Sequence, residues 1–76
     1  MSLNKKTMVR EIGRRTRLSN RDVERVIETL VEVWREELVS GGRIELENFM
    51  VLTVQQRPKR RVVLRVSKRL KLALVE

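Results

Sequence analysis

The apolar residues of the first forty positions recur with the 3.6-residue period of an α-helix. Met8, Val9 and Ile12 form one stripe, and Asn4 stands before them as a favourable N-cap. A first helix is therefore expected to begin after Asn4 and to end near Thr16.

A second, longer helix is expected after a short turn at Leu18. Ser19 is placed to act as its N-cap, and Asp22 brings an acidic charge to the first turn, where the helix dipole favours it. From residue 20 to residue 39 the apolar positions form one wide stripe: Val23, Val26, Ile27, Leu30, Val33, Trp34 and Leu38. The charged residues between them include both signs, which is typical of a solvated helix face and not of a catalytic site.

The period changes to two after Gly41-Gly42, the strongest break in the chain. Three strands are expected, at residues 44–46, 51–54 and 62–66. A turn at Glu47-Asn48 joins the first two, and they are expected to pair antiparallel. The basic link of residues 55–61 contains Pro58, which cannot join a central strand, so a second hairpin with a basic tip is predicted.

The last segment allows two interpretations. Leu70, Leu72 and Leu74 alternate as in a strand, whereas Leu70, Ala73 and Leu74 share one face of a helix for which Ser67 would be the N-cap. A short C-terminal helix is the preferred prediction.

These elements define an α+β fold with two N-terminal helices, a three-stranded antiparallel sheet and a short C-terminal helix. The chain has 76 residues, so one domain over 1–76 is expected, with a helical dimerisation half (1–40) and a basic sheet and helix half (41–76). The apolar stripe of the long helix is wider than so small a sheet can cover, which predicts a homodimer. Its expected core is Val26, Ile27, Leu30, Val33, Trp34, Leu38 and Phe49.

Composition excludes most catalytic chemistry. The chain has no cysteine and no histidine, so disulfides, thiol nucleophiles, imidazole bases and Cys/His zinc sites are ruled out. No enzyme activity, cofactor, metal or small-molecule substrate is expected. No apolar run approaches the roughly 20 residues of a membrane span, so a cytoplasmic protein without a membrane partner is expected.

Charge points to a polyanionic partner. The chain carries 18 Lys and Arg against 10 Asp and Glu, a net charge of +8, and no acidic residue occurs from Asn48 to Val75. Only Trp34 and Phe49 are aromatic, and both fit an apolar core better than a base-stacking platform. The candidate DNA-binding residues are Arg57, Lys59, Arg60, Arg61, Arg65, Lys68, Arg69, Lys71 and Lys5. The alternative is that these charges only keep the protein soluble.

The chain resembles the bacterial HU and integration host factor family of DNA-bending proteins along nearly its whole length. The segments that carry the resemblance are Asn4-Lys5-Lys6, Met8-Val9-Arg10-Glu11-Ile12, Thr16-Arg17-Leu18-Ser19, Asp22-Val23-Glu24, Leu30-Val31-Glu32-Val33, Gly41-Gly42-Arg43-Ile44-Glu45-Leu46, Phe49 and Leu64-Arg65-Val66-Ser67-Lys68-Arg69-Leu70-Lys71. The resemblance implies an intertwined dimer whose sheets form a saddle for double-stranded DNA in the nucleoid. It also implies a hairpin arm that follows the minor groove.

Three departures bear on mechanism. The family's turn usually has glycines beside the phenylalanine, where this chain has Asn48 and Met50, and Arg17 stands where a glycine is common. The long arm with its asparagine-proline tip is replaced by residues 55–61. Pro58 is interpreted as a turn former and not as an intercalating wedge, so weaker bending is predicted.

Two other functions stay open from the sequence. A dimer that has lost its arm would serve as a protein-interaction or scaffold module, and the same basic segment would serve in RNA binding. Lys5, with Lys6 and Arg10, either extends the phosphate track or faces solvent.

Overall fold

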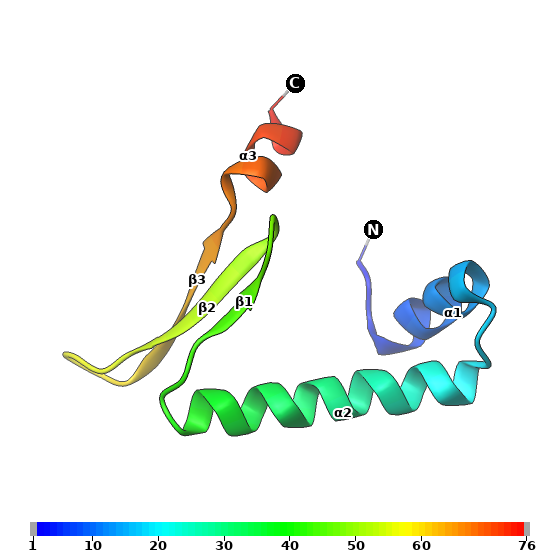
Figure 1. Ribbon diagram of the computed structural model, residues 1–76, viewed down its shortest axis with the longest axis horizontal. Helices are drawn as coiled ribbons and strands as arrows, with labels where there is room; N and C mark the ends of the chain where they lie inside the picture. Colours follow the sequence, from blue (N-terminus) through cyan, green and yellow to red (C-terminus); the bar gives the residue numbers. More distant parts are fainter. Residues whose placement is uncertain (1, 76) are drawn as a thin grey trace. The chain divides into compact units, whose positions relative to one another are not determined.

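The computed structural model describes residues 2–75, and its elements follow the predicted order (Figure 1). They are α1 (Lys5–Thr16), α2 (Asn20–Val39), β1 (Ile44–Leu46), β2 (Met50–Gln55), β3 (Arg61–Val66) and α3 (Lys68–Leu74). The chain divides into two compact units, one ending at Val33 and the other beginning at Trp34. The predicted division at residue 40 stays a prediction.

Helix α1 begins where the sequence predicts. The Asn4 side chain accepts a hydrogen bond from the Thr7 backbone N–H at 2.9 Å, and the Thr7 hydroxyl accepts one from the Asn4 N–H at 2.9 Å. This reciprocal capping box satisfies donors that a helix N-terminus leaves free. The helix ends at Arg17, whose φ of 64° is left-handed and whose N–H donates to the Gly13 carbonyl at 2.8 Å.

Helices α1 and α2 approach closely at the turn between them. A Cβ atom on Gly13 would lie 2.7 Å from the Asn20 Oδ1 atom and 3.3 Å from the Leu18 carbonyl oxygen, so these neighbours would have to shift. The buried residues of the first unit are Val9 and Gly13 of α1 and Val23 of α2. The Ser19 hydroxyl accepts from the Asp22 N–H at 3.1 Å, which confirms Ser19 as the cap of α2.

Replacing Arg17 with glycine is expected to stabilise the protein. A side chain at positive φ costs roughly 1 kcal/mol, and glycine does not pay this steric penalty. The free energy of unfolding, measured by urea denaturation, should therefore rise by about 1 kcal/mol in Arg17→Gly. Arg17→Ala removes the same charge but keeps the Cβ atom, and it should show no such gain. Equal stability of the two variants would mean that the Cβ atom of Arg17 is not strained.

The three strands form an antiparallel sheet in the order β1-β2-β3. Ile44 pairs with Leu52 in the first hairpin, and Leu52 pairs with Leu64 in the second. Directly paired residues project to the same side of a sheet, and neighbours along a strand project to opposite sides. One side of the sheet, the apolar face, therefore consists of Ile44, Leu46, Met50, Leu52, Val54, Val62, Leu64 and Val66. The opposite side, the basic face, carries Glu45, Val51, Thr53, Gln55, Arg61, Val63 and Arg65.

The turn between β1 and β2 and the start of α3 are tied together. Asn48 has a φ of 64°, so asparagine takes the left-handed position in a turn where glycine is the usual choice. The Ser67 N–H donates to the Phe49 carbonyl at 2.8 Å, and the Ser67 hydroxyl accepts from the Leu70 N–H at 3.0 Å. Ser67 is thus the N-cap of α3, which confirms the short C-terminal helix.

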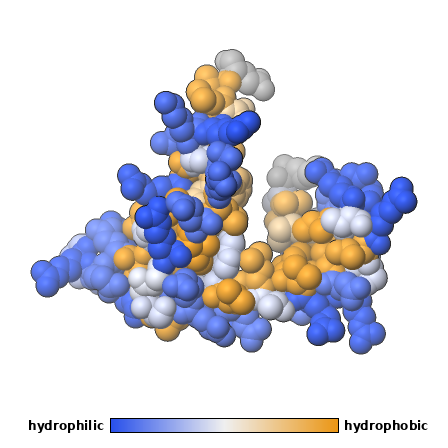
Figure 2. All heavy atoms as spheres, in the orientation of Figure 1, coloured by the Kyte–Doolittle hydropathy of each residue, from blue (hydrophilic) through white to orange (hydrophobic). Residues whose placement is uncertain are grey.

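Most apolar side chains of the single chain remain accessible to solvent. Val9, Val23 and Ile44 are the buried hydrophobic residues of the described chain. Hydrophobic side chains are visible on the surface along α2 in Figure 2. Val26 is 62% exposed, Leu30 43% and Val33 54%. None of the helices in residues 2–75 is sufficiently long and apolar to cross a bilayer.

Candidate nucleic-acid interface

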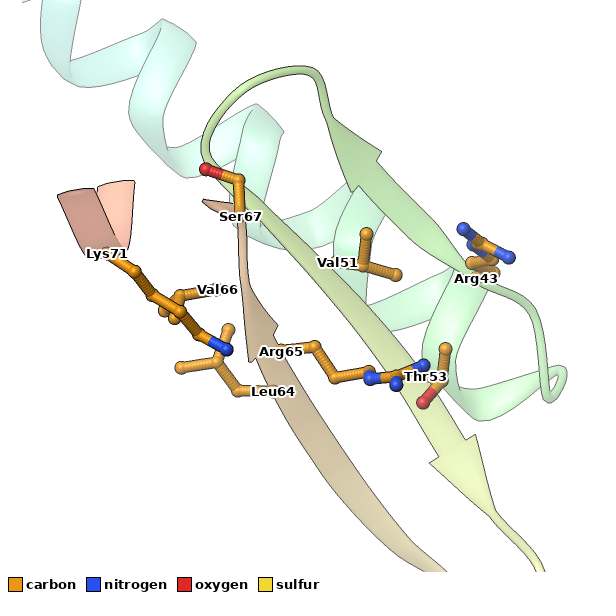
Figure 3. Close-up of a pocket in the computed structure, with 8 residues that line it drawn as sticks. All are labelled: Arg43, Val51, Thr53, Leu64, Arg65, Val66, Ser67 and Lys71. Carbon is orange, nitrogen blue, oxygen red and sulfur yellow. The ribbon is translucent and has the colours of Figure 1, made fainter. Parts of the chain in front are cut away.

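A shallow hollow lies where the basic face of the sheet meets the start of α3 (Figure 3). Its lining residues are Arg43, Val51, Thr53, Leu64, Arg65, Val66, Ser67 and Lys71. Arg65 extends from β3 across β2 toward Thr53, and Lys71 reaches down from α3. Two predicted DNA-binding cations, Arg65 and Lys71, therefore border the same hollow.

Sequence reasoning missed Arg43, a third cation of this hollow. Its Nη2 atom lies 2.9 Å from a carboxylate oxygen of Glu45, and both side chains are well exposed. Exposed ion pairs of this kind contribute little to stability, so a phosphate can replace the carboxylate. The alternation after Gly42 could have indicated this residue, because it places Arg43 on the same side of the chain as Glu45. Glu45 pairs with Val51, and Val51 pairs with Arg65, so these three residues lie on one face of the sheet.

The first turn of α3 adds polar groups at the edge of the hollow. The Ser67 oxygen accepts the Leu70 N–H, so its own proton is free to donate to an anion. Lys68 and Arg69 follow directly and are exposed. The cations predicted at the corner between β3 and α3, which include Lys68 and Arg69, are thus close together along the chain and accessible to solvent.

The four cations predicted at the tip between β2 and β3 differ in their contacts. The Gln55 side chain donates to the Arg57 carbonyl at 2.8 Å and accepts from Arg61 at 3.0 and 3.1 Å. Arg60 donates to backbone carbonyls of α2. Within residues 2–75, the side chains of Arg57 and Lys59 form no hydrogen bond or ion pair.

Lys5 belongs to the first unit and is engaged in ion pairs there. Its Nζ atom lies 2.5 Å from a carboxylate oxygen of Glu28 and 3.8 Å from one of Glu24. The hydrogen bond to Glu28 is the main cause that raises the pKa of Lys5. A phosphate contact by Lys5 has to compete with these carboxylates, and that assignment stays a prediction.

Two other cations of α1 share one carboxylate. Arg14 and Arg15 hold the Glu11 carboxylate at 2.9 and 3.1 Å. The hydrogen bond from Arg14, followed by that from Arg15, lowers the pKa of Glu11 to about 2. The two arginines and the one carboxylate leave a net charge of +1 in this part of α1.

The residues predicted as the dimer core are largely uncovered in the single chain. Val26, Leu30, Val33 and Phe49 are exposed, and Ile27, Trp34 and Leu38 are only half-buried. So large an uncovered apolar surface is unusual for a soluble monomer and marks an interaction site.

The described residues show no arrangement for catalysis by a metal. No group of three or more acidic side chains that could hold a metal ion occurs in residues 2–75. The polar residues that line the hollow are three cations, Ser67 and Thr53, and their side chains can donate hydrogen bonds to an anion. The site is therefore suited to holding phosphate groups on an open surface.

Comparison with known proteins gives consistent similarities. A family model described as bacterial DNA-binding protein matches residues 3–65. The integration host factor subunit beta of Alkalilimnicola ehrlichii is 40% identical over 48 residues, which are 63% of this chain and 48% of that protein. The match thus spans about half the length of that relative. A mutant of HU from Thermotoga maritima superposes with a TM-score of 0.88 at 23% identity, over 96% of this chain and 100% of that one.

Proposed function

The chain belongs to the bacterial DNA-binding protein family of HU and integration host factor, and from this membership we propose that it binds duplex DNA through phosphate contacts, with little dependence on sequence. The observation that carries the proposal is the convergence of Arg43, Arg65 and Lys71 on one open hollow, beside the free hydroxyl proton of Ser67. In this proposal the chain acts as a non-enzymatic architectural protein of the nucleoid.

Phosphate binding needs positive charge near the DNA backbone more than it needs exact geometry. Each phosphate that a Lys or Arg neutralises releases condensed counterions, and this release drives binding. The basic face and the start of α3 provide such charges on an accessible surface: Arg43, Arg65, Lys68, Arg69 and Lys71. The arginines of this set carry planar donors that could also contact base edges, but nothing in the set identifies a preferred sequence, so phosphate contacts are proposed as the main source of affinity.

The functional unit in this proposal is a homodimer. The uncovered residues of α2, together with the exposed Leu46, Val62 and Leu64 on the apolar face of the sheet, support it. A second copy that covers these residues removes apolar area from water, at about 25 cal/mol per Å². The unit division at Val33 falls within α2, so the same helix contributes to both parts of the chain.

The short tip limits how the protein deforms DNA. Residues 56–60 are the whole connection between β2 and β3, and Pro58 lies in the middle of it. An intercalating wedge needs an arm that reaches into the minor groove, and this connection is too short to form one. We propose that bending arises from wrapping along the charged surface and is weaker than bending by a wedge.

The proposal is tested by fluorescence anisotropy of a labelled random-sequence duplex at several salt concentrations. The logarithm of affinity should fall linearly with the logarithm of salt concentration, by roughly 0.9 per phosphate contact, and a second duplex sequence should give the same line. A flat salt dependence or strong sequence selectivity would contradict it. Absence of binding at low salt would favour a protein-interaction or scaffold module, and preference for a matched RNA duplex in competition would favour RNA binding.

A further inference from the structure

The C-terminal end of α2 lacks a cation of its own. The last turn of the helix contains no basic residue, whereas Glu36 and Glu37 lie within it. A helix C-terminus carries partial negative charge, so acidic residues there are unfavourable and a cation is favourable. This end of the helix therefore needs positive charge from another part of the chain.

Backbone N–H groups of the described residues donate to every carbonyl of the last turn of α2 except that of Val39. The Ser40, Gly41 and Gly42 N–H groups donate to the carbonyls of residues 36, 38 and 37 at 3.1, 3.0 and 2.8 Å. Gly41 has a φ of 84°, and the two glycine bonds form the Schellman arrangement that commonly ends a helix. Within residues 2–75, no backbone N–H donates to the Val39 carbonyl.

Arg60 fills that position from the tip of the second hairpin. Its Nη2 atom donates to the Val39 carbonyl and, at 3.4 Å, to the Leu38 carbonyl. Leu38, Val39, Val54 and Val62 line a small hollow together with Arg60 and Arg61, so apolar contact accompanies the hydrogen bonds. All of these residues lie in the unit that begins at Trp34.

We infer that Arg60 is a positioning residue that caps the C-terminus of α2 and thereby holds the β2–β3 tip in place. It is not one of the phosphate contacts. In this assignment Arg57 and Lys59 are the free cations of the tip, and Arg60 fixes the loop from which they extend. The effect on DNA affinity rests on the proposed function, whereas the capping itself does not.

The first experiment measures amide hydrogen exchange of the free protein by NMR. In Arg60→Ala the N–H groups of Ser40, Gly41 and Gly42 should exchange several-fold faster, because the end of α2 opens more often. Lys59→Ala removes the same charge from the adjacent position and should leave those rates unchanged. Arg60→Lys keeps a donor and a positive charge, and it should restore most of the protection. Unchanged exchange in Arg60→Ala would overturn the capping role, whether or not the protein binds DNA.

The second experiment compares the salt dependence of duplex affinity in the same variants. Lys59→Ala should reduce the slope by roughly one per lost phosphate contact. Arg60→Ala should lower affinity about threefold at an unchanged slope, because the loop becomes less ordered while no phosphate contact is lost. A slope reduced as in Lys59→Ala would identify Arg60 as a phosphate contact and overturn the inference. If the unmodified protein fails to bind the duplex, the proposed function fails and the exchange experiment still decides the capping role.

Discussion

Leu30→Glu is expected to abolish folding and self-association together. Leu30 lies in the middle of the apolar stripe of α2 and is 43% exposed in the single chain, where the proposed partner subunit would cover it. Covering an unpaired carboxylate costs several kcal/mol, and a dimer pays this cost twice. A small domain is stable by only about 5–15 kcal/mol, so the loss removes most of its stability.

Circular dichroism and analytical ultracentrifugation measure the two effects of this substitution. Arg35→Gln is the matched control, because it changes the charge of the same helix by the same amount at an exposed polar position. The control should remain a folded dimer, whereas Leu30→Glu should lose helical signal at every protein concentration. A folded monomeric Leu30→Glu protein would disprove an intertwined dimer in which folding requires the second copy.

The triple substitution Arg65→Ala, Lys68→Ala and Lys71→Ala is expected to reduce duplex affinity about 100-fold or more at moderate salt. Arg65 and Lys71 border the hollow of the basic face, and Lys68 lies beside the Ser67 hydroxyl at the start of α3. The reduction should be the same for duplexes of different sequence, because these side chains are proposed to contact phosphates. The salt slope should fall by roughly one for each contact removed.

A control with the same loss of net charge separates local contacts from general attraction. Arg21→Ala, Arg25→Ala and Arg35→Ala together remove three exposed positive charges from α2. These three arginines are not among the proposed phosphate contacts, so this triple variant should lose only a few-fold in affinity through weaker general attraction. Equal losses in the two triple variants, measured by anisotropy, would argue against a defined site at the basic face.

The local elements could be predicted from the sequence because their signals are short in range. Asn4, Ser19 and Ser67 are all N-caps in the structure, and each was recognised from its position before an apolar period. Arg17, which stands where the family commonly has glycine, takes the left-handed conformation, and Asn48 does the same in the turn before Phe49.

The contacts between distant side chains could not be predicted in the same way. Arg60 was grouped with three neighbouring cations, because nothing local distinguishes it from Lys59 or Arg61. Its contact with Val39 spans 21 positions and depends on how the second hairpin lies against the end of α2. Arg43 was missed because an isolated arginine before a strand gives no charge cluster; the alternation places it on the side of Glu45, but the register across β2 is needed to relate that side to Arg65.

The position of β3 at the edge of the sheet has a consequence for solubility. Within the described chain β3 pairs only with β2, so its outer backbone groups are available to another strand. Val62 and Leu64 are exposed on a strand of high β-propensity, which is the composition that promotes edge-to-edge aggregation. Arg61 and Arg65 interrupt this strand with positive charges that repel a second copy of the same edge. Arg65, one of the proposed DNA contacts, is therefore also expected to protect the DNA-free protein from aggregation, and its removal should lower solubility as well as affinity.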